Sequence, residues 1–177
     1  MDNISNSIRT LYSDYDFSYL LNKYIDKNYW LKHIKEHFSK ENIENLTDFN
    51  YSKSFTYHID LSNSNLRIGT KEFELYLNKG HQLYRLEVMI SLLAPYISYH
   101  FFKYSLENDS INLQGKTIPF VDEHKIYLEK IRLFSKANKL KILTDDCLKS
   151  KIEVPSYSSS ASVYKLLFEN SEIGFPY

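Results

Sequence analysis

The stretch LYRLEVMISLLAPYISYHFFKYSLEN, residues 83–108, decides the fold of this chain. Aliphatic and aromatic side chains alternate along it with other side chains, and a period of two residues is typical of a β-strand. Pro95 interrupts the stretch, because a proline cannot donate a backbone hydrogen bond inside a sheet. The pattern therefore predicts two long antiparallel strands that are broken near Pro95.

The first of these strands has two different faces, because successive side chains of a strand point to opposite sides of the sheet. One face is apolar and carries Tyr84, Leu86, Val88, Ile90 and Leu92. The other face is mixed and carries Arg85, Glu87, Met89 and Ser91.

Two segments before this stretch show the same alternation. SFTYHIDL (54–61) places on one face Phe55, Tyr57, Ile59 and Leu61. TKEFELYL (70–77) places on one face Phe73, Leu75 and Leu77, and a glycine-containing turn follows it. We therefore expect a meander of about four antiparallel strands, and KLKILT (139–144) adds one short strand.

Helical periodicity flanks this sheet. Apolar residues spaced by threes, fours and sevens predict one helix from Asp14 to about Lys40, with a shorter helical piece around 4–11 before it. A second helix follows Asp122 and a last one lies in ASVYKLLFEN (161–170), where Ser159 or Ser160 is the expected cap. Thr144 or Asp145 caps a brief turn, and the polar segments 39–53 and 107–125 are expected to be connectors.

These elements predict an α+β fold, in which N-terminal and C-terminal helices pack on an antiparallel sheet of about four to five strands. The length of 177 residues fits a single domain, 1–177. We find no internal repeat and no linker of biased composition.

Composition excludes several classes of function. The 22 basic and 22 acidic residues balance, so the chain lacks the positive charge of a general nucleic-acid or anionic-membrane binder. Its longest apolar stretch falls far short of the ~20 residues of a membrane-spanning helix, and no secretory signal opens the chain. The single Cys147 and the absence of glycine-rich phosphate loops favour a cytoplasmic protein without a cofactor.

The motif HIKEH (33–37) raises a zinc-dependent hydrolase as an alternative. His33 and His37 stand one helical turn apart with Glu36 between them, which is the spacing of an inverted zinc-protease motif. The same helix turns Leu31, Ile34 and Phe38 toward a core, which makes the histidines part of an ordinary polar face. A zinc site also requires a third ligand from elsewhere.

Other polar residues give weaker signals. His58 and Asp60 lie two apart on one strand face, an arrangement that alternation alone produces. Asp145 and Asp146 directly precede Cys147, and nearby carboxylates favour an unreactive, protonated thiol over a nucleophile. The basic run KIRLFSKANKLK (130–141) keeps a nucleic-acid-binding adaptor or regulator as a further alternative, which the neutral total charge disfavours.

The tyrosine content points to a binding module. The chain has 16 tyrosines, more than a core of this size uses, and tyrosine is enriched in protein–protein interfaces. We place the contact surface on the mixed strand face and the adjoining loops, and alternation selects Arg85, Glu87, Tyr99 and Lys103 as partner-binding candidates.

Three stretches together resemble a known group of proteins: residues 83–104, LTDDCLKSKIEVP (143–155) and SASVYKLLFEN (160–170). They are similar to the second half of small bacterial α+β immunity proteins, the partners of polymorphic or contact-dependent toxins. The resemblance rests on hydrophobic pattern and covers about the last hundred residues. It implies a cytoplasmic, non-enzymatic protein that binds and neutralises one cognate toxin domain, and it carries no site residue over.

Overall fold

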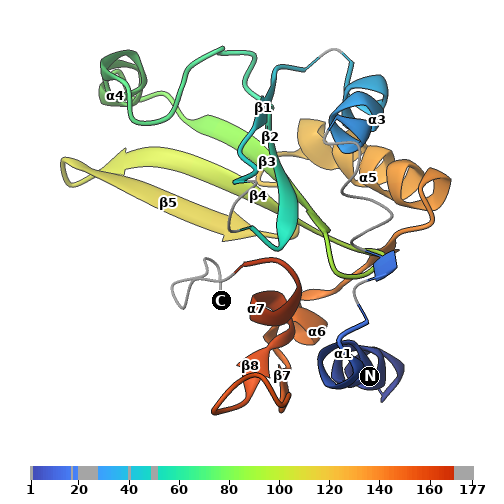
Figure 1. The fold of residues 1–177 in the computed structure, drawn as a ribbon. Helices are drawn as coiled ribbons and strands as arrows, with labels where there is room; N and C mark the ends of the chain where they lie inside the picture. Colours follow the sequence, from blue (N-terminus) through green and yellow to red (C-terminus); the bar gives the residue numbers. More distant parts are fainter. Residues whose placement is uncertain (1, 17, 20–27, 40, 49–51, 170–177) are drawn as a thin grey trace.

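The computed structural model describes residues 2–16, 18–19, 28–39, 41–48 and 52–169. Its main sheet has six strands, in the order β1-β2-β3-β4-β5 with β6 beside β4 (Figure 1). These strands are β1 (Ile43–Asn45), β2 (Ser54–Asp60), β3 (Leu83–Ser91), β4 (Tyr96–Glu107), β5 (Ser110–Lys116) and β6 (Lys141–Ile142). A separate two-stranded sheet joins β7 (Lys151–Ile152) to β8 (Ala161–Ser162).

Helices stand at both ends of the chain and between the strands. They are α1 (Asp2–Asp14), α3 (Tyr29–His37), α4 (Lys71–Asn78), the 3-10 helix η1 (Asp122–Lys125), α5 (Ile126–Ala137), α6 (Asp145–Lys149) and α7 (Val163–Leu167). The α+β class and the N-terminal and C-terminal helices are confirmed. The sheet is larger than expected and is mixed, because β6 runs parallel to β4.

The two long strands of residues 83–108 form the centre of the sheet, as predicted. Leu83 lies opposite Tyr104 and Ile90 lies opposite Ile97, so the register of β3 and β4 is unbroken over the whole contact. The segment around Pro95 turns between them, and the amide of Tyr96 donates to the carbonyl of Ala94. Strand β2 then pairs antiparallel with the other side of β3.

One face of the sheet is covered by α3 and α5, which lie together on its right-hand side in Figure 1. Trp30 and Ile34 of α3 and Ile131 and Phe134 of α5 are fully buried against the apolar residues of β2, β3 and β4. We call this side of the sheet the α5 face. It buries the predicted apolar face of β3.

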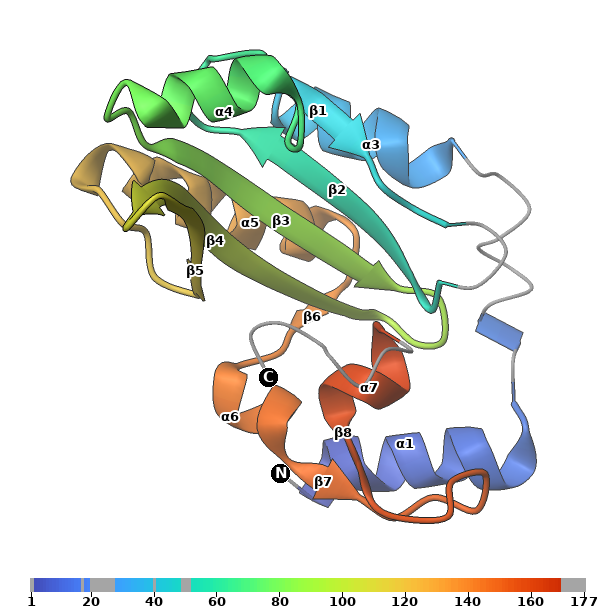
Figure 2. The same cartoon turned by 90° about the vertical axis from the view of Figure 1, so that its left-hand side faces the viewer.

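The opposite face, which we call the α4 face, has two separate covers (Figure 2). At one end α4 packs Phe73 and Leu77 on Leu83, Phe102 and Tyr104. At the other end α1, α6 and α7 form a second cluster around Met89 and Tyr96.

Hydrogen bonds fasten the C-terminal segment to this second end of the sheet. The hydroxyls of Ser54 and Ser91 donate to the carbonyls of Phe168 and Leu167, at 2.9 and 2.8 Å. The hydroxyl of Tyr12 donates to the carbonyl of Leu166 at 2.6 Å and joins α1 to α7. Helices α1 and α7 therefore belong to one cluster on this face of the sheet.

The segment TKEFELYL is a helix, and the predicted strand is wrong. The Thr70 hydroxyl accepts the amide of Phe73 and begins α4, with acidic residues in the first turn where the helix dipole favours them. Phe73 and Leu77, four residues apart, are each 1% exposed, whereas Leu75 is 60% exposed. Helical spacing therefore decides which side chains are buried.

Two predicted connectors contain strands. Residues 43–45 form β1, and residues 110–116 form β5 after a tight turn at Asn108 and Asp109. Both turn residues have positive φ, 51° and 58°, as a two-residue hairpin turn requires and as asparagine and aspartate tolerate. The first part of the predicted connector 107–125 therefore forms a hairpin with β4.

Predicted helices also differ in their bounds. The N-terminal helix α1 ends at Asp14, where the next residue, Tyr15, has a φ of 51°, so no helix begins there. The C-terminal part of the predicted helix is α3; Phe17, Leu20, Leu21 and Tyr24, which the prediction also used, lie outside the described residues. The cap of α7 is Ser162 rather than Ser159 or Ser160.

Two leucines of α4 test the helix. We expect Leu77→Ala to lower the free energy of unfolding by about 2 to 4 kcal/mol, because it empties a buried site. Leu75→Ala should change it by less than about 0.5 kcal/mol, because that side chain is exposed. Urea unfolding of both variants measures this difference, and equal losses would contradict a helix in favour of a strand.

Candidate functional site

The four residues predicted to bind a partner do not share a surface. Arg85 and Glu87 lie opposite Phe102 and His100, so they belong to the α4 face. Tyr99 and Lys103 alternate with these and belong to the α5 face, where Tyr99 packs with its apolar core. The expectation of one mixed contact face is therefore corrected by the register, and a partner-binding role for each residue stays a prediction.

Arg85 is buried in an ion pair. Its Nη1 lies 3.4 Å from Oδ2 of Asp60, and the two side chains are 3% and 0% exposed. Nη2 of Arg85 donates to the carbonyl of Leu66 in the loop that leads to α4. Since a charge removed from water needs close partners, this arginine ties the loop to the sheet.

Asp60 organises the start of the same loop. Its carboxylate accepts the amides of Ser62, Ser64 and Asn65 at 2.9, 3.1 and 2.9 Å. The hydroxyl of Ser64 donates to it as well, at 3.1 Å. A single buried carboxylate thus holds the loop and neutralises Arg85, which gives Asp60 a structural role.

Glu87 stands between two histidines of the neighbouring strands. The register places His58 on β2 and His100 on β4 directly beside it. Nε2 of His58 lies 3.1 Å from one carboxylate oxygen, and Nδ1 of His100 lies 3.7 Å from the other. The three side chains are 11%, 0% and 14% exposed for His58, His100 and Glu87, so we call them the buried His–Glu–His row.

Opposing effects set the pKa of Glu87. Burial favours the neutral carboxyl group and is the largest single effect. The interactions with His100 and His58 together outweigh burial and lower the pKa to about 2. The Glu87 carboxylate is therefore ionised over the whole physiological range.

The two histidines of the HIKEH motif contact polar groups of their own helix. Nδ1 of His33 lies 3.2 Å from Oε2 of Glu36, and Nδ1 of His37 donates to the carbonyl of His33 at 3.0 Å. The ring of His37 stands edge-on to Phe134, with centroids 5.3 Å apart. Within the described ranges, no three His, Cys, Asp or Glu side chains are grouped to hold a metal ion.

Cys147 is a buried thiol in α6. Burial raises its pKa, and the nearby Lys141 opposes this effect. A raised pKa keeps the thiol protonated and weakly nucleophilic at neutral pH.

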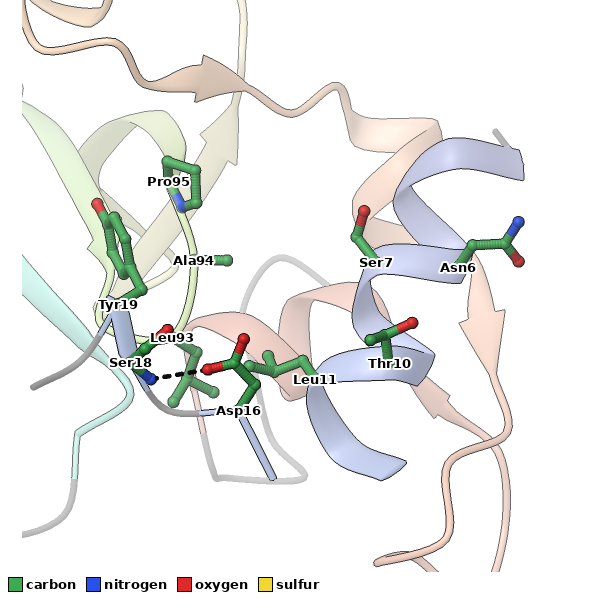
Figure 3. A pocket seen from close by; sticks show the side chains of 10 residues that line it. All are labelled: Asn6, Ser7, Thr10, Leu11, Asp16, Ser18, Tyr19, Leu93, Ala94 and Pro95. Carbon is green, nitrogen blue, oxygen red and sulfur yellow. Dashed lines mark hydrogen bonds between the residues drawn. The ribbon is translucent and has the colours of Figure 1, made fainter. Parts of the chain in front are cut away.

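A hollow of about 470 Å³ lies between α1 and the turn of residues 93–95 (Figure 3). Its wall includes Thr10 and Leu11 of α1, and the amide of Ser18 donates to Asp16 at 3.1 Å beside it. That hydrogen bond is a local turn contact.

Lys103 and Lys116 meet on the α5 face. Their ammonium groups lie 5.7 and 4.2 Å from the centre of the Phe120 ring, which places two cations near one aromatic ring. This cluster stands beside β5, at the end of the sheet remote from β1.

The exposed hydrophobic side chains are unevenly distributed. Of the eight large ones in the described part of the chain, five lie between residues 111 and 133: Ile111, Leu113, Ile118, Ile126 and Leu133. Ile126 and Leu133 are 60% and 50% exposed and stand seven residues apart, on one outer side of α5. We call Ile126 and Leu133 the aliphatic surface.

Part of the basic run 130–141 is neutralised. Nζ of Lys130 lies 2.6 Å from a carboxylate oxygen of Glu41. The guanidinium of Arg132 makes two hydrogen bonds with Glu129, at 2.8 and 2.9 Å. These pairs reduce the charge that the run offers to phosphates.

Comparisons of the chain with known protein families, with curated proteins and with solved structures found no match. Among the helices that the structure describes, none is both long enough and apolar enough to span a bilayer.

The His–Glu–His row makes stability depend on pH. Because the pKa of Glu87 falls from an ordinary 4.5 to about 2 on folding, the unfolded chain binds more protons between these values. The free energy of unfolding should therefore fall as the pH is lowered through this range, by at most about 3 kcal/mol for this group.

The variant Glu87→Gln should lose this part of the acid dependence, as urea unfolding at each pH would show. Glu153→Gln alters an exposed carboxylate and is the matched control, with an acid profile like that of the unchanged protein. Parallel profiles for the unchanged protein and Glu87→Gln would contradict the assignment.

Proposed function

We propose that this protein acts by binding another protein, and that its partner is a bacterial toxin domain which it neutralises in the cytoplasm. The observation that carries the proposal is the aliphatic surface. Ile126 and Leu133 expose 60% and 50% of their area, although α5 buries its other side well.

Exposed aliphatic side chains grouped on one region are characteristic of contact surfaces. On α5 they alternate with the ion pair of Glu129 and Arg132, which gives an apolar centre and a charged rim. Lys103, Lys116 and Phe120 stand on the same face of the sheet and add cationic and aromatic groups. Aromatic residues such as phenylalanine are enriched in protein interfaces.

The resemblance of the second half of the chain to immunity proteins selects the kind of partner. The two C-terminal stretches that carry it, 143–155 and 160–170, form α6, β7, β8 and α7 in their described residues. Their apolar side chains are buried in the cluster that includes α1, whereas polar residues such as Lys151 and Glu153 are exposed. We choose α5 as the candidate contact surface because its exposed side chains are aliphatic.

The proposal is tested in two steps. The tagged protein is first purified from its native cells, and we expect one stoichiometric partner. The partner's C-terminal domain is then expressed alone, where it should arrest growth, and co-expression of this chain should restore growth. A partner that is harmless on its own would contradict the immunity function.

The contact surface is tested with Ile126→Asp and Leu133→Asp. Each places a charge in the proposed apolar centre and should weaken partner binding about tenfold or more, which corresponds to about 1.4 kcal/mol. Isothermal titration measures the affinity. Leu75→Asp is the matched control, since Leu75 is equally exposed on the distant helix α4 and should bind normally. Full binding by the double α5 variant would place the surface elsewhere.

A further inference from the structure

The two edges of the main sheet differ sharply. At one edge β1 has three residues, and Glu44 pairs there with Arg67 at 3.8 Å. At the other edge β5 has seven residues, and no described strand pairs with its outer side. Natural proteins usually protect a long edge with charges, prolines or bulges. Residues 110–115 of β5, SINLQG, contain no charge and no proline.

The register identifies which backbone groups face outward. The hairpin closes at Glu107 and Ser110, and in a two-residue hairpin these residues bond to each other. Even-numbered residues of β5 therefore bond to β4, and Ile111, Leu113 and Gly115 direct their amides and carbonyls outward. The bond from the amide of Leu143 to the carbonyl of Ile97 agrees, because it lies on this same side of β4.

The outward residues are also the apolar ones. Ile111 and Leu113 are 47% and 38% exposed and share the α4 face. Gly115 continues this row without a side chain. The edge thus offers three residues with outward backbone groups. Two of them, Ile111 and Leu113, carry aliphatic side chains, and Gly115 carries none.

We propose that β5 pairs antiparallel with β5 of a second copy of the chain, about a two-fold axis at Leu113. In this register Leu113 lies opposite Leu113 of the other copy, and each Ile111 lies opposite Gly115. The glycine leaves room for the isoleucine. All three outward positions of each strand are paired, which makes the edge complementary to itself.

The charged residues near the ends of β5 also favour pairing with a second copy of the chain. The antiparallel register places Lys116 opposite Ser110 of the second copy and next to its Asp109, so opposite charges meet at both ends of the contact. No like charges face each other between residues 110 and 116. The inference is independent of the toxin-binding proposal, because Ile126 and Leu133 belong to α5 and not to this edge strand.

Cross-linking tests the register directly. Leu113→Cys places two thiols on the axis, within the Cα separation of about 5.5 Å that a disulfide accepts. We expect it to form a covalent dimer on mild oxidation, read on a non-reducing gel. Ile111→Cys is the matched control on the same strand and face: its two copies lie four residues apart along the strands and should remain uncoupled.

Native mass provides the second readout. Sedimentation of the unchanged protein should give twice the 21.1 kDa chain mass, and Leu113→Lys should halve it by opposing two ammonium groups on the axis. Leu75→Lys should stay dimeric, and circular dichroism confirms that each variant is folded. A monomeric unchanged protein, or equal cross-linking by the two cysteine variants, would overturn the proposal and leave the edge to a strand of another protein.

Discussion

Both faces of β3 are buried, and most of the structure follows from this constraint. The apolar face requires α3 and α5, and the other face requires α4 at one end and the C-terminal cluster at the other. Arg85 and Glu87 lie on that second face, where an unpaired charge would cost several kcal/mol. Asp60 and His58 stand opposite them on β2, at 3.4 Å from Arg85 and 3.1 Å from Glu87. A slip of one residue would separate these pairs, so charge as well as shape fixes the register.

Much of this fold could be predicted from local patterns. The hydrophobic period predicts only one type of element for β2, β3, β4 and α5. Thr144 is likewise a typical helix cap. TKEFELYL was ambiguous, because Phe73, Leu75 and Leu77 fit a strand while Phe73 and Leu77 alone fit a helix. Only Phe73 and Leu77 pack against the sheet, and this depends on tertiary contacts that the local sequence does not show. Strand β5 was missed because an edge strand with two aliphatic residues carries little hydrophobic signal.

The candidate sites were harder to predict than the fold. Alternation shows that Arg85 and Glu87 share a side of their strand, yet it does not show what covers that side. That side is covered by α4, which the sequence pattern predicted as a strand, and by α7, which lies some eighty residues further along the chain. The signal that could have found the network is the matching i, i+2 spacing of His58 and Asp60 with Arg85 and Glu87. It has this meaning only once the register of β2 and β3 is known.

The two proposed surfaces impose a geometry on each other. Antiparallel pairing at β5 requires a two-fold axis perpendicular to the sheet, so the same face of both copies points in one direction. Both α5 helices, with Ile126 and Leu133 on their outer sides, then stand on that face. A dimer would bind two separate partners without added affinity, but it would bind two linked partner domains far more tightly than a monomer. Self-pairing at the edge therefore matters for function only when the partner is itself multivalent.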